Sequence, residues 1–218
     1  MKISIIVPSL REQQLLKCVE SIITTTSGID YEIIIISPFR PPVPCVWLKE
    51  EKPKGVNYAV ERGYRRSKGE WIFVMSDEDR FTDGFLLTLY KFALPHAGKL
   101  FIANPVLFGG VTTFDRPSIG YYGKMFAPFP FIQKESAEKL GGLYDLRYKS
   151  FFADPDLSLR CWEAGGEVRR CDKARLYHPH IEDKLHMAAK TANFDKDQKA
   201  FAARWAHLGE LTDARRIQ

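Results

Sequence analysis

The sequence predicts an α/β fold in which helices flank a mostly parallel central sheet. Short, continuously apolar runs alternate with segments whose apolar residues recur at helical spacing. Such runs are typical of strands that are buried on both faces, and strand–helix alternation is typical of parallel sheets. Acidic residues follow the run that ends at Met75, and the carboxyl ends of parallel strands are where such sheets bind ligands.

In the first half, apolar runs predict four strands and the segments between them predict two helices. The strands are Ile3 to Val7, Glu32 to Ile36, Val46 to Leu48 and Trp71 to Met75, and the helices contain Leu15 to Ile23 and Val56 to Tyr64. Ser9 and Glu12 have the spacing of a capping box, which predicts the start of the first helix. Prolines after Ile36 end the second strand.

The second half is less regular. The predicted elements are helices at 84–92, 134–140 and 155–164, a strand at 99–103, short strands near Val168 and Leu176, and a polar helix from Lys184 with Phe201 and Trp205 on one face. Segment 104–130 is rich in Gly, Pro and aromatic residues, which predicts a long loop or small lobe. Its aromatic residues are candidates either for the wall of a binding pocket or for the core: Tyr121, Tyr122, Phe126 and Phe129.

Length and composition fit one ordered domain over residues 1–218. The chain is 45% hydrophobic and 27% charged, and its net charge of +5 is mild and dispersed. This charge suits an anionic ligand or an acidic membrane surface and does not indicate a nucleic acid partner. The cysteines form no Cys-x-x-Cys pair, and no signal peptide or membrane span is predicted. We therefore expect a cytoplasmic protein, with peripheral membrane association left open.

Three adjacent acids, Asp77, Glu78 and Asp79, follow the predicted strand at 71–75. Adjacent carboxylates repel each other unless a cation lies among them. Magnesium and manganese usually take one or two carboxylates, waters and phosphate oxygens, so the cluster predicts a metal site; a solvated acidic turn is the alternative. His178 and His180 are two apart on a predicted strand and would point to opposite faces, so at most one reaches the same metal.

Asp154 and Asp156 lie at the start of a predicted helix. Pro155 is a residue type favoured at the first helical position, so Asp154 has the sequence context of an N-cap. A capped carboxylate is also fixed in space, which makes Asp154 a candidate general base. Asp156 and Arg160 are four residues apart, and this spacing predicts an intrahelical ion pair.

In order and spacing, three segments resemble family 2 glycosyltransferases of the GT-A fold, from Lys2 to about His180. They are "SIIVPSLREQQLLKCVESI", "GVNYAVERGYRRSKGEWIFVMSDEDRF" and "KLGGLYDLRYKSFFADPDLSLRCWEAGGEV…ARLYH". The resemblance implies a Rossmann-like nucleotide-binding half at 1–103, a smaller acceptor-side half at 104–183 and a helical tail at 184–218. It also implies inverting transfer of a sugar from a nucleoside diphosphate donor, with UDP favoured, to a hydroxyl of a glycan, lipid or protein.

The resemblance also assigns site residues by position. It implies Asp154 as the base, and Mn²⁺ or Mg²⁺ held by Asp77, Asp79 and His178. The implied donor-binding residues are Pro8, Ser9, Leu10, Ser37, Lys54, Asn57, Asp77 and Glu78. Arg62, Arg65, Arg66 and Lys54 are further candidates to face phosphate, or are solvated residues of a helix face.

Several positions depart from the family pattern and leave alternatives open. Segment 37–40 reads Ser-Pro-Phe-Arg where the family has Asp-Asp-Gly-Ser, Ser76 replaces an acid, and Ala153 replaces a glutamate. These changes leave the nucleotide base and the metal-binding acid undetermined. A nucleotidyltransferase that makes nucleotide sugars and a non-catalytic nucleotide-sugar- or glycan-binding module are the alternative functions. A homodimer is compatible with all three.

Overall fold

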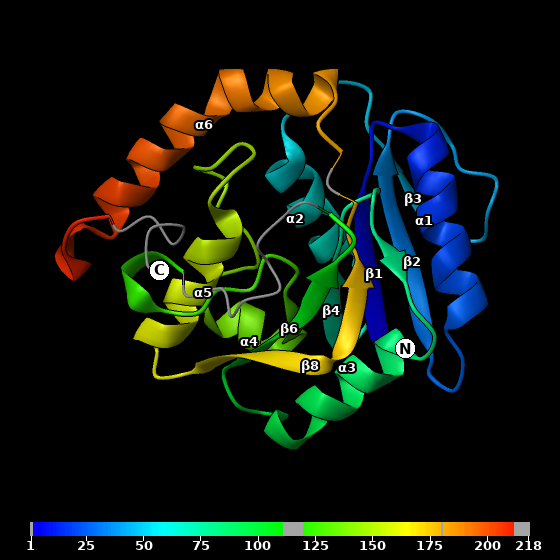
Figure 1. Ribbon diagram of the computed structural model, residues 1–218, viewed down its shortest axis with the longest axis horizontal. Coiled ribbons are helices and arrows are strands. Elements are labelled where there is room, and N and C mark those ends of the chain that lie inside the picture. Colours follow the sequence, from blue (N-terminus) through cyan, green and yellow to red (C-terminus); the bar gives the residue numbers. More distant parts are fainter. Residues whose placement is uncertain (1, 111–119, 180, 212–218) are drawn as a thin grey trace.

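The computed structural model contains an eight-stranded sheet in the order β3-β2-β1-β4-β7-β6-β8-β5 (Figure 1). It describes residues 2–110, 120–179 and 181–211. The strands are β1 (Ile3–Pro8), β2 (Tyr31–Ser37), β3 (Val46–Lys49), β4 (Trp71–Val74), β5 (Arg80–Phe81), β6 (Phe101–Phe108), β7 (Phe131–Gln133) and β8 (Glu167–Tyr177). The α-helices are α1 (Glu12–Thr25), α2 (Val56–Arg66), α3 (Phe85–Ala93), α4 (Lys134–Lys139), α5 (Ala153–Glu163) and α6 (Lys184–Arg204).

The first four strands form the parallel half of the sheet. β1 pairs in parallel with β2 and β4, and β2 pairs in parallel with β3. Along β1 and β2 the side chains alternate between two hydrophobic clusters, so that Ile5 and Ile6 face opposite sides of the sheet. This burial on both faces explains why these strands are continuously apolar in sequence, and the predicted mostly parallel α/β sheet is confirmed.

The second half of the sheet mixes directions. β7 is antiparallel to both of its neighbours, β4 and β6, whereas β8 is parallel to β6 and antiparallel to β5. The two short strands predicted near Val168 and Leu176 are one continuous strand, β8. The register against β6 shifts between Pro105 and Val106, which interrupts the apolar pattern that would have revealed one strand. β6 also extends to Phe108, into the segment predicted as loop.

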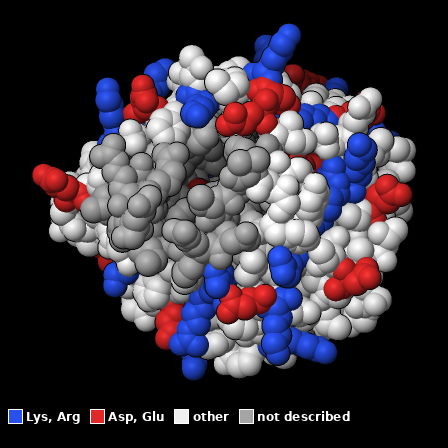
Figure 2. Space-filling view, in the orientation of Figure 1, with Lys and Arg blue, Asp and Glu red and all other residues white. Residues whose placement is uncertain are grey.

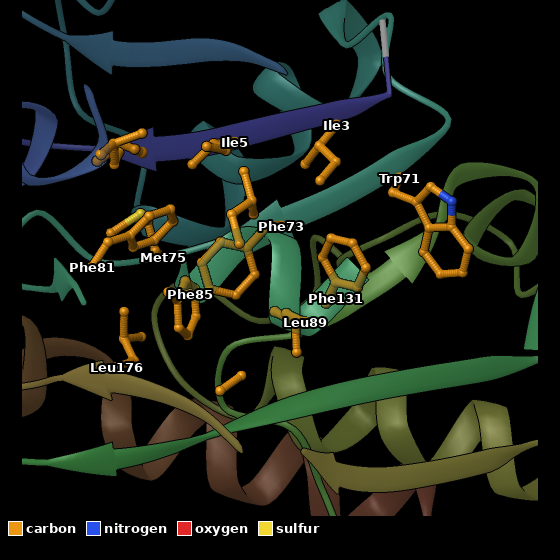
Figure 3. Close-up of a cluster of buried hydrophobic side chains, with 14 of the residues drawn as sticks. Ile3, Ile5, Trp71, Phe73, Met75, Phe81, Phe85, Leu89, Phe131 and Leu176 are labelled. Atoms are coloured by element: carbon orange, nitrogen blue, oxygen red, sulfur yellow. The ribbon is translucent and has the colours of Figure 1, made fainter. Parts of the chain in front are cut away.

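Two hydrophobic clusters cover the two faces of the sheet. On one face, α1 and α3 pack against β1 and β4 with large side chains such as Phe73, Phe85 and Leu89, seen in Figure 3. On the other face, α2, α5 and α6 contribute Val60, Leu157 and Phe201. The helices thus leave the carboxyl ends of the parallel strands as the place where a site can form.

Helix α6 runs along the side of the molecule toward which β1 and β2 point (Figure 1). Phe201 and the following Trp205 are buried, as the sequence predicts for one face of a polar helix. In the part of the chain that the structure describes, no helix is both long enough and apolar enough to cross a bilayer. On the face seen in Figure 2, basic and acidic side chains are interspersed.

Candidate active site

The three adjacent acids lie in a tight turn directly after β4. The backbone N–H of Ser76 donates to Oδ2 of Asp79 at 2.7 Å, and the N–H of Asp79 donates to the carbonyl of Ser76 at 3.2 Å. The guanidinium of Arg80 donates to the carbonyls of Asp77 and Asp79, at 3.0 and 2.7 Å. These bonds fix the turn, and Arg80 places a positive charge beside the acids.

Arg11 neutralises the first acid of the cluster. Its Nη1 lies 2.9 Å from Oδ1 of Asp77, and the hydroxyl of Ser9 donates to Oδ2 of Asp77 at 2.7 Å. Burial raises the pKa of Asp77, while Ser9 and Arg11 oppose this shift. Arg11 also contacts both carboxylate oxygens of Asp183, at 2.6 and 3.0 Å, and holds the pKa of Asp183 well below its usual range. Asp183 caps α6, because it accepts from the N–H of His186.

Glu78, Asp79 and His178 form a second group within the cluster. Nδ1 of His178 lies 2.7 Å from Oδ1 of Asp79, and Nε2 lies 3.8 Å from Oε1 of Glu78. The N–H of Ile181 donates to Oε2 of Glu78 at 2.7 Å. Burial raises the pKa of Asp79 to about 6 although His178 opposes it. Burial lowers the pKa of His178, but Asp79 and Glu78 outweigh this and leave it raised.

These contacts bear on which residues could hold a divalent metal. Among the described residues, no three His, Cys, Asp or Glu side chains are arranged as a metal site. Asp77 is bound by Arg11 and Asp79 is bound by His178. Glu78 Oε1 and His178 Nε2 face each other, and one carboxylate with one imidazole fits a cation completed by phosphate oxygens and water. Asp79 would then orient His178 from behind.

Asp154 is the second residue of α5 and is half-buried. The interpretation of Asp154 as an N-cap is wrong: the N-cap position is Phe152, and no side chain there makes a capping hydrogen bond. Phe152 has a φ of 66°, a left-handed conformation that is costly for a residue with a Cβ. Burial raises the pKa of Asp154 to about 7. Its charge in turn raises the pKa of the buried Tyr144, after burial itself.

A short segment before β7 connects Asp154 to the acid cluster. The N–H of Ala127 donates to Oγ of Ser158 at 3.1 Å, and this hydroxyl donates to the carbonyl of Asp154 at 2.9 Å. Two residues further on, the ring of Phe129 packs on His178 with 5.4 Å between ring centroids. The segment therefore contacts the start of α5 at one end and the histidine of the cluster at the other.

The remaining predicted donor residues occupy different surroundings. Pro8 ends β1 and Leu10 is exposed, and both are chain neighbours of Ser9, whose hydroxyl donates to Asp77. The hydroxyl of Ser37 is fully buried between the carbonyl of Phe39 and the indole N–H of Trp47.

The two predicted donor residues near α2 serve other contacts. Asn57 is buried and donates from its side chain to the carbonyl of Tyr148. Lys54 is exposed, with its ammonium over the ring of Tyr58.

The other candidates divide between structural and surface roles. Asp156 and Arg160 form the predicted intrahelical pair, at 2.9 Å. Arg62 donates to the carbonyl of Lys49, and Arg65 pairs with a glutamate of its own helix. The aromatic candidates are partly buried in the interior: Tyr121 packs on Phe126, Phe152 and Phe201, Tyr122 packs on Phe201, and Phe129 packs on His178. His180 lies outside the described residues.

Sequence reasoning missed two residues that organise the site, Arg11 and Asp183. Arg11 follows the first strand, so its position next to a ligand-binding edge was a usable signal. The apparent capping box hid it: Ser9 bonds to Asp77 and to the N–H of Arg11, and Arg11 itself occupies the N-cap position of α1. No local signal distinguishes Asp183 from other surface acids.

Comparison with solved structures identifies the architecture. The chain superimposes on GalNAc-T7, whose crystal structure contains UDP, GalNAc and Mn²⁺, with a TM-score of 0.65 and 14% identity over 96% of this chain and 51% of that chain. The chain has the GT-A fold. It also matches S. aureus TarS, with a TM-score of 0.66 and 12% identity over 94% of this chain and 44% of that chain. The match to TarS 1-349 in complex with UDP-GlcNAc has a TM-score of 0.67 and 13% identity. It covers 87% of this chain and 61% of that chain.

The chain thus spans about half the length of these structures. No protein-family model matches the sequence, and no curated protein matches it. Membership of family 2 stays a prediction from the motifs quoted above.

Proposed function

We propose that the protein is an inverting glycosyltransferase that moves a sugar from a nucleoside diphosphate donor, with UDP favoured, to a hydroxyl acceptor. One observation carries the proposal. On a GT-A fold, the carboxyl edge of the sheet has a carboxylate–imidazole pair, Glu78 and His178, and α5 begins with a separate carboxylate, Asp154, whose pKa is about 7. The first can hold a cation and the second can accept a proton.

In this proposal Asp154 acts as the general base. A carboxylate with a pKa of about 7 is half ionised at pH 7 and mostly ionised by pH 8, and it is still basic enough to accept the proton of an acceptor hydroxyl. A single carboxylate suffices for in-line displacement with inversion, because the leaving diphosphate needs no second acid. Burial of the carboxylate raises its pKa, because desolvation disfavours the charged form.

The donor would bind where Ser9, Asp77 and Glu78 lie together. Glu78 and His178 would hold Mn²⁺ or Mg²⁺, and Asp79 would hold the imidazole in the ligating orientation through Nδ1. When bound, such a cation stabilises the negative charge that develops on the leaving diphosphate. This ligand set replaces Asp77 and Asp79 of the sequence prediction by Glu78, since Arg11 and His178 already bind those two acids.

Turnover with a panel of nucleotide sugars and Mn²⁺ tests the function. We expect release of nucleoside diphosphate from one donor, and we expect Asp154→Asn to abolish transfer while donor affinity changes less than about twofold. Asp172→Asn, at an exposed acid, is the matched control. Pyrophosphate release from a sugar phosphate and a nucleoside triphosphate would instead identify a nucleotidyltransferase. Donor binding without turnover would identify a binding module.

Calorimetric titration of Mn²⁺ in the presence of UDP tests the ligand set. Glu78→Gln should weaken Mn²⁺ binding at least about tenfold, and Asp79→Asn should weaken it by about 10- to 100-fold through loss of the histidine orientation. Asp77→Asn is the comparison variant. Loss of Mn²⁺ binding in Asp77→Asn alone would return the ligand role to Asp77.

A further inference from the structure

Helix α6 carries a buried carboxylate, that of Asp197, which is only 2% exposed. It accepts hydrogen bonds from three consecutive backbone N–H groups. Lys149 donates to Oδ1 and Oδ2 at 3.0 and 3.1 Å, Ser150 donates to Oδ2 at 2.8 Å, and Phe151 donates to Oδ2 at 3.0 Å. Consecutive N–H groups that converge on one anion form a nest, and bonds to an ionised acceptor are stronger than neutral ones.

The loop formed by residues 148–151 is also held from its opposite side by the start of α2. Asn57 donates from its backbone N–H to the carbonyl of Lys149 at 3.3 Å and from its side chain to the carbonyl of Tyr148 at 3.2 Å. On the α6 side, the amide of Asn193 adds a bond to Oγ of Ser150 at 3.0 Å. The loop therefore has its carbonyls bound by one helix and its N–H groups bound by another.

This loop leads directly into Phe152, the residue with left-handed φ, and from there into α5. A non-glycine residue remains in that conformation only when its surroundings over-determine it. Asp197 supplies these constraints on one side, and the packing of the Phe152 ring against Phe194 and Phe201 of the same helix supplies others. Release of the loop would allow Phe152 to relax toward an extended conformation and would turn the start of α5.

We propose that Asp197 is a positioning residue for the base: by binding the N–H groups of residues 149–151, it fixes the backbone corner at Phe152 and so the place of the Asp154 carboxylate. Asp197 touches no reacting atom in this arrangement and acts only through the loop. The catalytic part of this inference rests on the proposed transferase function, whereas the placement of the carboxylate does not.

Asp197→Asn tests the inference, with Asp195→Asn as the matched control, since Asp195 is exposed two residues earlier on the same helix. The asparagine keeps one acceptor oxygen but loses the charge and turns an N–H₂ group toward the loop. Carbon-13 NMR of the Asp154 carboxyl, assigned with Asp154→Asn, follows its titration. Tyr144 is a titratable group that interacts with Asp154, and its phenol is followed in parallel.

We expect the Asp154 midpoint near pH 7 in the wild type and in Asp195→Asn, and a displacement toward the ordinary value of about 4 in Asp197→Asn. With a donor that is turned over, kcat should fall at least about tenfold while the donor KM stays within about twofold. A purely structural role would lower kcat only in proportion to the folded fraction. An unchanged Asp154 titration in folded Asp197→Asn overturns the inference.

Asn193→Ala decides the question if Asp197→Asn does not fold, because it removes only the bond to Ser150. It should displace the titration in the same direction by a smaller amount, and no displacement contradicts the inference. Absence of turnover in the wild type, together with a displaced titration in the variant, refutes the transferase function and leaves the positioning role standing.

Discussion

Replacement of Asp156 by Asn should destabilise the fold more than any other single removal of charge that we consider. Asp156 is fully buried, and its carboxylate joins α5 to the end of α6. Oδ1 accepts from the hydroxyl of Tyr148 at 3.1 Å, from the indole of Trp205 at 3.1 Å and from Arg204 at 2.8 Å, while Oδ2 accepts from Arg160 at 2.9 Å.

The size of the stability loss depends on which contacts of the Asp156 carboxylate an asparagine amide can keep. An asparagine oxygen in the Oδ1 position keeps three acceptor contacts, but its N–H₂ group then faces the guanidinium of Arg160. Two partly buried arginines also lose their neutralising charge, although Arg160 keeps bonds to three carbonyls and Arg204 keeps its bond to Asp145. Removing one partner of a buried ion pair costs about 3–5 kcal/mol, which for a chain of this length lowers Tm by roughly 6–20 °C.

Urea and thermal unfolding of wild type and Asp156→Asn measure the loss. Asp172→Asn provides the control, because Asp172 pairs with Arg170 at the surface and its own side chain is 72% exposed. That variant should lose less than about 1 kcal/mol. A loss below about 1 kcal/mol for Asp156→Asn as well would refute the argument, since it would mean that Arg160 and Arg204 need no buried counter-charge.

Three further outcomes follow from the site. The pKa of Asp154 in the folded protein, about 7, lies above its value in the unfolded chain, so its contribution to stability is complete at acid pH and is lost as pH rises through 7. Asp154→Asn should therefore flatten the pH dependence of the unfolding free energy between about pH 5 and 8. An unchanged pH dependence would contradict the raised pKa. Gly55→Ala should lower the free energy of unfolding, measured by urea denaturation, by at least about 2 kcal/mol. The reason is that φ of Gly55 is 108° and the new methyl would collide with the carbonyl of Lys149. Arg11→Lys cannot bind Asp183 through two nitrogens, so amide exchange in the first turns of α6 should accelerate; equal exchange would show that the pair does not hold the helix.

The parallel half of the sheet could be predicted from sequence because each strand carries its own signal. A strand buried on both faces is largely apolar, whatever its neighbours are, and β1, β2 and β4 follow this rule with Ser4 as a buried, hydrogen-bonded exception. The β8 prediction was incomplete for a related reason. Much of its middle is exposed and charged, so only its pairing with β6 reveals one strand.

The candidate site was less accessible to sequence reasoning because its contacts join distant positions. The hydroxyl of Ser9 had a plausible local partner in the first helix, yet it binds Asp77, 68 positions away. The acids at 77–79 predicted a nearby cation, and one positive charge beside them is the guanidinium of Arg11, which pairs with Asp77. No local spacing in the sequence relates Arg11 to these acids. The unusual backbone at Phe152 arises from packing by α6, whose effect on a loop more than 40 residues earlier leaves no local pattern.

The hydrogen bonds of Asp197 have a consequence for the order in which the molecule matures during synthesis. The loop at 149–151 leaves the ribosome long before its carboxylate partner, which is 46 to 48 positions further along the chain. A nascent chain can therefore build its parallel strands early and still lack a fixed corner ahead of α5. Any activity that depends on that corner begins only when α6 has been translated and has docked.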